Sequence, residues 1–250
     1  RPATAAAMRA RHAGPPGLRL RPPLPPLPLP LPLPLPLSPL RPPRAAVRGI
    51  DLDIAPGRLV AIVGKVASGK STLAHGILSL VKCSKGSVSV GGRTALVAQK
   101  PFIMNDTVRN NITFCSDFDE ERYLAAVHAC ALAPDMKVFV DGDRTEVGEQ
   151  GVTISGGQKQ RLALARAAYA NADVVVFDDP LSAMDAHVGM TVFKRCFKTL
   201  LAGRTRVFFT NQLQFCEFCD EVVVLDGGEV VQHGTYDELI AVQGGHFAEM

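Results

Sequence analysis

The sequence predicts an α/β domain: a parallel sheet with flanking helices, an antiparallel β edge and a helical subdomain. Two continuous apolar runs carry this prediction, because Leu59–Val63 (LVAIV) and Val174–Phe177 (VVVF) have the length and the β-branched character of buried strands. The first run ends in a glycine loop and the second in two carboxylates, Asp178 and Asp179. Of the 250 residues 47% are apolar, which is enough to bury a sizeable core.

Residues 1–46 are expected to be a disordered, low-complexity segment outside this domain. All but four of the nineteen prolines lie before Arg44, and the alternating Leu-Pro repeat of residues 24–37 favours an extended polyproline II rod without a core. We favour a linker, or an artefact of how the chain's start was defined. A proline-recognition ligand and an organelle-targeting peptide stay open as alternatives, although serine is scarce for a transit peptide.

Charge and hydropathy exclude several functional classes. Eight arginines precede the first acidic residue, Asp51, and removing them from the formal net charge of +3 leaves the remainder at −5. A mildly acidic domain does not predict nucleic-acid binding. A run of eighteen apolar residues is missing from the sequence, and proline at every second position of the Leu-Pro repeat forbids a helix there, so we expect no direct bilayer span.

The six cysteines predict reduced thiols, because no signal peptide precedes them and a cytosolic compartment is then expected. Cys216 and Cys219 form a CxxC pair. A structural zinc site needs four ligands, and neither a second pair nor a His-x-x-x-His pattern follows. We therefore expect two small residues packed in or near a helix rather than a metal or redox pair.

The first folded segments surround a phosphate-binding pattern. Ile50, Leu52 and Ile54 alternate with acidic residues, which predicts a half-buried strand before the strand at 59–63. Residues 64–71 (GKVASGKS) match G-x-x-x-x-G-K-[ST], and a helix is expected from residue 70 to about residue 80. The loop amides and the helix N-terminus would converge on an anion, which predicts a P-loop NTPase core. The alternative is a plain glycine turn between any strand and helix.

Strands are next expected at residues 86–90 and 94–99, followed by a helical subdomain over about 105–152. Its helices are expected at residues 105–111, at 119–132 and from about residue 134. Residues 155–158 (SGGQ) begin a further helix, where exposed amides and a hydroxyl can contact a phosphate. After the strand at 174–179 we expect a helix to about residue 200, strands at 206–210, 221–225 and 229–233, and a closing helix at 237–242.

The paired carboxylates Asp178 and Asp179 predict chemistry, because like charges at the end of a buried strand repel and are poorly solvated. A bound cation or a proton-transfer role explains them better than stability. Three landmarks therefore follow one another in the chain: the glycine loop, SGGQ and the acidic strand end. In this order they resemble the nucleotide-binding domain of ATP-binding-cassette (ABC) transporters over residues 47–250.

Longer stretches resemble the first cassette of the multidrug-resistance-associated, or C, subfamily: QKPFIMNDTVRNNI, TEVGEQGVTISGGQKQRLALARA and FDDPLSAMDAHVG. The resemblance implies that Mg-ATP is bound by Gly64, Lys65, Val66, Ala67, Ser68, Gly69, Lys70, Ser71 and Thr72. It implies magnesium ligands in Ser71, Gln99 and Asp178, and catalytic residues in Asp179, Asn211 and Gln99. By the same likeness Ser155, Gly156, Gly157 and Gln158 contact ATP bound on a partner domain, and residues 182–185 cross the dimer.

Several residues depart from the family's pattern. Asp179 stands where most cassettes have glutamate, so its carboxylate falls about 1.5 Å short of the attacking water. Asn211 replaces a histidine that contacts the γ-phosphate, and it carries no positive charge. Ala67 replaces a loop glycine, a tolerable change if its φ is negative. An aromatic residue for stacking on adenine is missing, because Phe102 is the first aromatic residue in the chain.

The resemblance predicts a domain that binds and hydrolyses Mg-ATP in a head-to-tail dimer with a second nucleotide-binding domain. It would power solute export through a transmembrane export domain, from the cytoplasmic face of a membrane, with weak turnover at its own site. A mostly non-hydrolytic ATP clamp that regulates a partner cassette is the first alternative. A soluble ABC ATPase of translation or DNA repair is the second, and it would predict a second cassette or long heptads. The transported substrate and the membrane are not readable from these residues.

Overall fold

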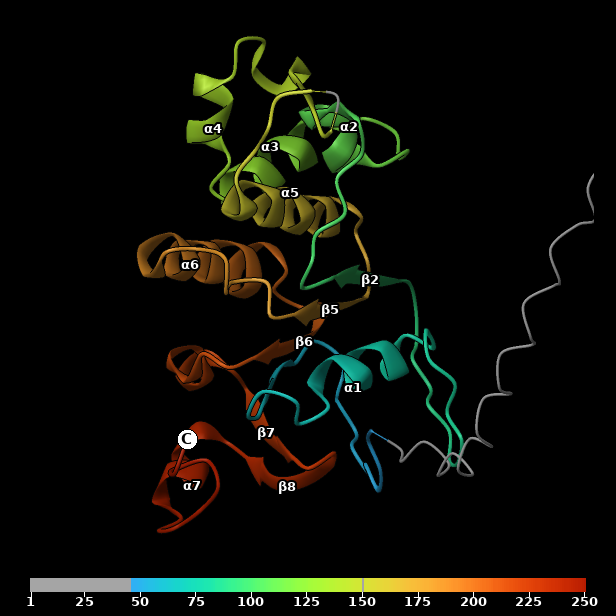
Figure 1. Cartoon of the computed structure of the whole chain (residues 1–250), viewed down its shortest axis with the longest axis vertical. Coiled ribbons are helices and arrows are strands. Elements are labelled where there is room, and N and C mark those ends of the chain that lie inside the picture. The colour runs from blue at the N-terminus through green and yellow to red at the C-terminus, as the bar shows by residue number, and fades with distance from the viewer. Residues whose placement is uncertain (1–45, 150) are drawn as a thin grey trace, which may run out of the picture. The chain divides into compact units, whose positions relative to one another are not determined.

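The computed structural model describes residues 46–149 and 151–250, so the expectation for the Leu-Pro segment lies outside the described residues. A six-stranded sheet organises the fold (Figure 1). Its strands, in spatial order, are β2 (Thr94–Val97), β5 (Val174–Asp178), β6 (Thr205–Thr210), β1 (Leu59–Val63), β7 (Glu221–Asp226) and β8 (Glu229–Gly234). Neighbouring strands from β2 to β7 are parallel, and β8 pairs antiparallel with β7. The predicted α/β class with an antiparallel edge is confirmed.

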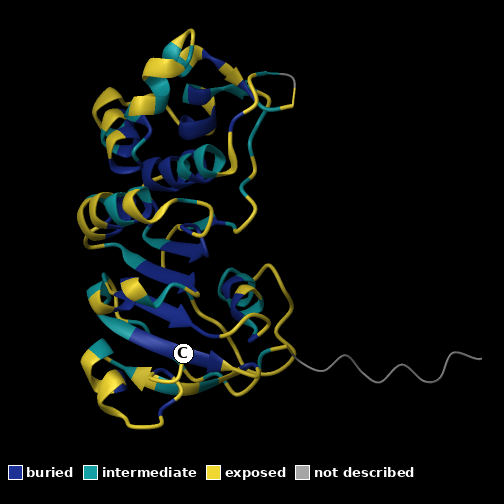
Figure 2. Ribbon diagram, turned by 60° about the vertical axis from the view of Figure 1, so that its left-hand side comes forward, coloured by how far each residue is buried: buried dark blue, intermediate teal, exposed yellow. Residues whose placement is uncertain are grey.

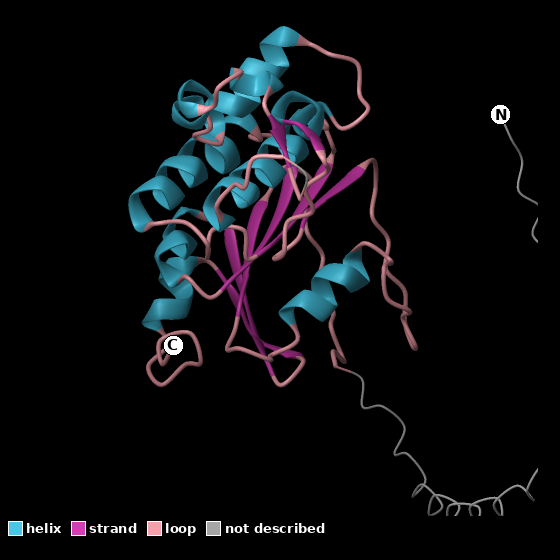
Figure 3. Cartoon of the chain, turned by 45° about the horizontal axis from the view of Figure 1, so that its top comes forward, coloured by secondary structure: helices cyan, strands magenta, loops and turns pink. Residues whose placement is uncertain are grey.

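The central strand β1 is buried on both faces, as its continuous apolar sequence requires. Val60 and Ile62 pack in one core cluster with Ala74 of helix α1 (Lys70–Ile77). Leu59, Ala61 and Val63 belong to the larger cluster on the other face. The α1 helix accordingly lies on one side of the sheet, and most of the other helices lie on the opposite side (Figure 3).

The larger cluster joins the sheet to helix α5 (Gly156–Tyr169), to α6 (Ala186–Val192) and to the π-helical segment Phe193–Leu200. Buried residues run through the strands and along the inner side of α5 (Figure 2). A 3₁₀ segment, Leu213–Phe218, follows β6, and the helix α7 (Tyr236–Ala241) follows β8. None of the helices in residues 46–149 and 151–250 has a long apolar stretch that could span a bilayer.

The region between β2 and α5 is mainly helical, as expected. It contains α2 (Val108–Thr113), α3 (Glu120–Ala129), α4 (Ala133–Val138) and a short 3₁₀ turn, Gly142–Arg144. A small antiparallel pair, β3 (Asp106–Thr107) with β4 (Glu146–Val147), ties the beginning of this subdomain to its end. The helix expected at 105–111 therefore starts later, because its first residues pair with β4 instead. Helices α2 and α3 both pack against α5 (Figure 1).

Two expected strands are wrong. Ile50, Leu52 and Ile54 do face the α1 side of the core while Asp51 and Asp53 are exposed, but the segment is not a strand. Residues 86–90 are not a strand either, and the first four of them are exposed. Alternating side chains report burial, whereas a strand also needs a neighbouring backbone to complete its hydrogen-bond ladder. Within the described residues neither segment has one.

Candidate functional site

The parallel sheet brings three predicted segments to one edge, because parallel strands present their carboxyl ends together. Strand β1 ends at Val63, directly before the glycine loop, and Val63 is the register partner of Thr210 at the end of β6. Strand β5 ends at Asp178, the register partner of Phe209. The loop, the two carboxylates and Asn211 therefore converge, although more than a hundred residues separate the loop from the acids.

Glycine is required at the first position of the loop. A Cβ on Gly64 would lie 2.2 Å from the Leu225 carbonyl oxygen and 2.6 Å from Ser68 Oγ, closer than atoms can approach. At the other end Gly69, which caps helix α1, has a φ of 103°, in the left-handed region that favours glycine. These two positions fix how the loop leaves β1 and enters α1.

Alanine would be tolerated in place of the loop glycine at position 67 if its φ were negative. The φ of Ala67 is 67°, so this condition is not met. The left-handed conformation brings Cβ close to the following carbonyl and costs roughly 1–2 kcal/mol for a residue other than glycine. The replacement of the loop glycine is therefore strained. Backbone strain of this kind is common where a segment is shaped for a ligand.

Lys70 folds back over the loop. Its buried ammonium group donates to the carbonyl oxygens of Gly64 (2.7 Å) and Lys65 (2.9 Å). Burial lowers the pKa of Lys70, while the charges of Asp179 and Asp178 raise it. Since an ammonium group has three N–H donors, two hold the side chain in place and one is left for an anion.

Ser71 and Asp178 form the oxygen pair of the site. The Ser71 hydroxyl, in the first turn of α1, donates to Asp178 Oδ1 at 3.1 Å, and the Asp178 side chain is buried. Gln99 is exposed and follows β2, which pairs with β5 in the register Val97 to Phe177, so Gln99 and Asp179 stand equally far along neighbouring strands. Hard oxygen donors of this kind suit Mg²⁺.

The described side chains at this site do not by themselves complete the coordination shell of a metal ion. Among the described residues no three His, Cys, Asp or Glu side chains gather in a way that could hold a metal ion. Magnesium usually takes one or two protein ligands, with phosphate oxygens and water completing its octahedron. The Ser71 and Asp178 pair therefore fits a magnesium ion that arrives with a phosphorylated ligand, rather than a resident structural metal.

The buried Ser68 hydroxyl is a further group of the loop that could bind an anion. Its Oγ has no hydrogen-bond partner among the described residues, although the Ser68 backbone is bonded to Lys65 and Gly228. Buried hydroxyl groups normally find a partner, because leaving one unpaired costs about 1–3 kcal/mol. An anion in the loop, or water with it, would provide one.

The backbone of Asp179 has a strained conformation, and its amide and carbonyl groups both have hydrogen-bond partners. Its φ is 49°, its amide donates to the Phe209 carbonyl at 2.9 Å, and its carbonyl oxygen accepts from the Ser182 hydroxyl at 2.8 Å. Burial raises the pKa of the Asp179 carboxyl group and the nearby Asp178 adds to this, while hydrogen bonds from Ser182 and Thr210 oppose it. The carboxyl group is therefore held between strand ends and is poorly solvated.

Thr210 was not expected to take part in the site. Its fully buried hydroxyl donates to Asp179 Oδ1 at 3.4 Å and accepts from the Gln212 amide at 3.0 Å. It thereby links the Asp179 carboxylate to the turn that carries the exposed Asn211. The only signal in the sequence is its place next to Asn211 at the end of a strand.

The SGGQ segment forms a well-capped helix start at a separate location. Ser155 caps α5 by accepting from the Gln158 amide at 3.2 Å, and Gln158 Oε1 accepts from the Ser155 amide at 2.8 Å. A Cβ on Gly157 would lie 3.1 Å from the Ala183 carbonyl oxygen, so the segment is next to the 182–185 loop. Within the described residues no hydrogen bond joins Ser155–Gln158 to the glycine loop, and α5 and α1 lie on opposite sides of the sheet.

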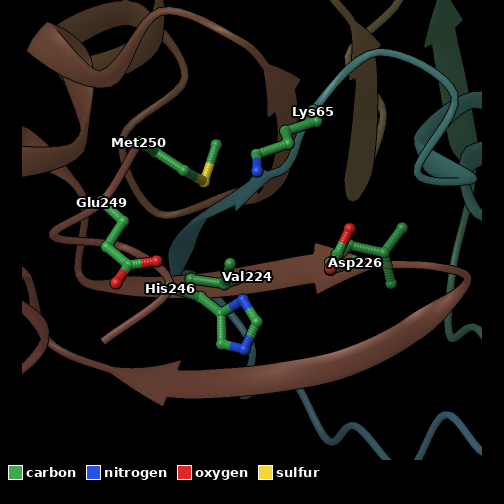
Figure 4. A pocket seen from close by; sticks show the side chains of 7 residues that line it. Lys65, Val224, Asp226, His246, Glu249 and Met250 are labelled. Atoms are coloured by element: carbon green, nitrogen blue, oxygen red, sulfur yellow. The ribbon is translucent and has the colours of Figure 1, made fainter. Parts of the chain in front are cut away.

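A shallow cavity lies beside the glycine loop but is not the phosphate site. Figure 4 shows Lys65 next to Met250, with Glu249 and His246 of the C-terminal segment nearby and with Val224 and Asp226 of β7 completing the lining. The lining includes none of Lys70, Ser71 and Asp178. The phosphate site is therefore defined by the loop and the strand ends rather than by a cavity.

The CxxC pair is a pair of free cysteines. Cys216 is buried in the 3₁₀ segment, and burial raises the pKa of its thiol to about 12. Burial likewise raises the pKa of Cys219. Because the thiolate is the form that binds metals and reacts, these values support packing as the role of both side chains.

Comparisons with known proteins agree with this geometry. The family model for ABC transporters matches residues 47–182. The chain is 45% identical over 202 residues to "ATP-binding cassette sub-family C member 2" of Rattus norvegicus, covering 80% of this chain and 13% of that protein. It is 42% identical over 212 residues to "ABC transporter C family member 8" of Dictyostelium discoideum, covering 84% and 13%.

The "ABC-type transporter cicA" of Emericella nidulans is 46% identical over 193 residues, which are 77% of this chain and 14% of that protein. The chain thus spans 13–14% of the length of these relatives. The resemblance to the C subfamily is confirmed over most of the chain. The chain belongs to the ABC transporter family.

Proposed function

We propose that this chain binds Mg-ATP through its glycine loop, with Lys70 toward the outer phosphates and with Ser71 and Asp178 toward the metal. One observation carries the proposal: the Ser71 hydroxyl and the Asp178 carboxylate meet at 3.1 Å, beside a loop that Lys70 closes at 2.7 Å. Magnesium, when bound with ATP, would neutralise charge on the phosphates. The unpaired Ser68 hydroxyl and the third donor of Lys70 are the groups that the loop offers to an anion.

We further propose that the domain pairs head to tail with a second cassette and powers solute export, as the cytoplasmic part of a membrane transporter. Ser155–Gln158 would then contact ATP on the partner domain. Two observations support this arrangement: among the described residues no hydrogen bond joins the segment to the chain's own glycine loop, and α5 packs on the sheet face opposite α1. Two of the relatives are named transporters, which supports transport over a soluble role in translation or DNA repair.

Hydrolysis at the chain's own site is proposed to be weak. A water molecule in line with the γ-phosphate needs a carboxylate to orient it, and Asp179 is one methylene shorter than glutamate. A raised pKa would favour proton acceptance, but the carboxylate is bonded to Thr210 and its backbone is fixed by Phe209 and Ser182. Misplacement by about 1 Å can cost roughly a hundredfold in rate. A mostly non-hydrolytic clamp is therefore the second candidate function.

A nucleotide titration tests the binding proposal. Lys70→Ala removes the donor that closes the loop and should weaken Mg-ATP binding at least tenfold, since a hydrogen bond to a charged group contributes about 1.5–3 kcal/mol. Lys82→Ala is the matched control, because Lys82 is exposed and lies outside the site. Equal affinities of wild type, Lys70→Ala and Lys82→Ala would refute the assignment of the loop.

A further inference from the structure

We propose that Asp135 is a positioning residue, which holds Ser155–Gln158 in the geometry needed against ATP on the partner cassette. The inference deepens the proposed function and rests on the head-to-tail pairing. Asp135 lies in the first turn of α4, within the helical subdomain, and its two carboxylate oxygens both reach the first turns of α5. It contacts no residue of the glycine loop among the described hydrogen bonds.

The first oxygen fixes the side chain of Gln158. Gln158 Nε2 donates to Asp135 Oδ1 at 2.8 Å, while Gln158 Oε1 accepts from the Ser155 amide at 2.8 Å. A carboxamide has one donor end and one acceptor end, so these two bonds together fix its orientation. Asp135 therefore orients the group that closes the cap of α5, and with it the Ser155 backbone.

The second oxygen fixes Arg161, one turn further along α5. Arg161 Nη2 donates to Asp135 Oδ2 at 2.7 Å, and the two side chains are only 14% and 12% exposed. Ion pairs that are shielded in this way are screened little by salt. The surroundings are apolar, because Asp135 and Gln158 border a small cavity whose other lining residues are Val108, Leu132, Phe139, Ile154 and Leu162.

Loss of the carboxylate would remove the acceptor that two half-buried donors, Gln158 Nε2 and Arg161 Nη2, share. Arg161 Nε already has no partner among the described residues, so the guanidinium group depends on Asp135. Without its carboxylate partner, the Arg161 guanidinium group would shift toward another acceptor or admit water. Either response displaces the beginning of α5, where Ser155 and Gly156 are exposed and available to a partner. Because misplacement by about 1 Å can cost roughly a hundredfold in rate, a small displacement is enough to matter.

The chain provides a matched control in a second ion pair of the same subdomain. Arg109 Nε donates to Asp143 Oδ2 at 2.8 Å, and these side chains are 36% and 21% exposed. Neither residue contacts Ser155–Gln158 in the described structure. Asp143→Asn therefore removes a carboxylate from the subdomain without touching the α5 cap.

The test pairs the full chain with an intact second cassette of a C-subfamily relative. All chains carry Asp179→Asn, so that single-turnover ATP hydrolysis reports the partner's site. Asp135→Asn should lower that rate roughly tenfold to a hundredfold. The ATP affinity of the unpaired chain should change less than about twofold, and Asp143→Asn should leave both quantities unchanged. A structural role alone would lower the ATP affinity and the melting temperature together.

Gly156→Asp separates this inference from the proposal on which it rests. If Gly156→Asp leaves the rate at the partner's site unchanged, the head-to-tail proposal falls, and the role of Asp135 falls with it. If Gly156→Asp abolishes the rate but Asp135→Asn matches Asp143→Asn, the role of Asp135 alone is refuted. Should Asp135→Asn fail to fold, Asp135→Glu keeps the charge but shifts both acceptor oxygens by one methylene, and an unchanged rate in that variant would overturn the inference.

Discussion

The two sides of the proposed nucleotide site differ, although the same edge of the sheet builds both. On the proposed phosphate side, Lys70 donates to the Gly64 carbonyl oxygen at 2.7 Å, and Ser71 donates to Asp178 at 3.1 Å. On the hydrolytic side, Asp179 is strained at a φ of 49° and bonded to Thr210, and Asn211 is exposed and uncharged. The strand ends are equally well placed on both sides, so the difference lies in side-chain chemistry rather than architecture.

This contrast implies that binding and turnover can be changed separately. The phosphate side depends on backbone positions, such as Gly64, and on a lysine held by the loop itself. The hydrolytic side depends on the reach and charge of two side chains. Substitutions there should alter the rate of hydrolysis while leaving ATP affinity nearly constant.

The largest effect is expected from restoring the hydrolytic side. Asp179→Glu combined with Asn211→His should raise single-turnover hydrolysis at this chain's site about a hundredfold in a pair with an intact cassette, because one positioned donor contributes on the order of 3 kcal/mol. Each single change should do much less, since residues that act as a unit are not additive. ATP affinity, measured by titration, should change little.

Asp117→Glu, the same lengthening at an exposed aspartate outside the site, serves as the control and should have no effect. A natural chain that already hydrolyses ATP as fast as the double variant would remove the contrast between the two sides. The clamp would then be abandoned in favour of an ordinary ATPase site.

A smaller effect is expected on stability, from the buried charge on the hydrolytic side. Burial raises the pKa of Asp179, so the folded state favours the protonated form and loses stability as the pH rises above the ordinary value for aspartate, about 3.9. Asp179→Asn is neutral at every pH. Its melting temperature should exceed that of wild type by a few degrees at pH 7, since about 1 kcal/mol moves a domain of this size by roughly 2–4 °C.

The gain should shrink toward pH 3, where wild-type Asp179 is protonated in both states. Thermal unfolding by circular dichroism at several pH values measures it, and Asp226→Asn at an exposed position should show no such trend. A lower melting temperature for Asp179→Asn at pH 7 would mean that attraction to Lys70 outweighs desolvation. The charge of Asp179 would then stabilise the fold, which contradicts the prediction that this buried charge destabilises it.

The smallest effect concerns strain on the phosphate side. Ala67→Gly should relieve roughly 1–2 kcal/mol of left-handed strain and lose about 0.5–1 kcal/mol to chain entropy, for a net gain near 0.5 kcal/mol in urea unfolding. Ala170→Gly makes the same substitution at a φ of −61° and should destabilise the chain instead. Equal effects at the two positions would show that the conformation of Ala67 costs nothing.

The sequence predicted most of the sheet and the phosphate loop, for a local reason. Strands β1 and β5 are continuous apolar runs, and the loop pattern is contiguous from Gly64 to Ser71, so neighbouring residues carry the whole signal. The alternation at residues 50–54 predicts the burial of these side chains correctly but predicts strand pairing wrongly. A ladder depends on a second segment, which local alternation does not specify.

What the residues alone determined is the chemistry available: a lysine, a hydroxyl and carboxylates in an order that resembles an ABC cassette, with Asp179 and Asn211 where the resemblance implies glutamate and histidine. Tertiary structure decided which of these groups meet. The parallel register brings Asp178 to Ser71 and Thr210 to Asp179, and the packing of α4 on α5 brings Asp135 to Gln158 and Arg161. The left-handed backbone conformations of Ala67 and Asp179 are likewise properties of the folded chain, which no local pattern indicated. Hydrogen bonds between residues far apart in sequence have no local pattern, because only the folded sheet and its helices bring such groups within hydrogen-bond distance of one another.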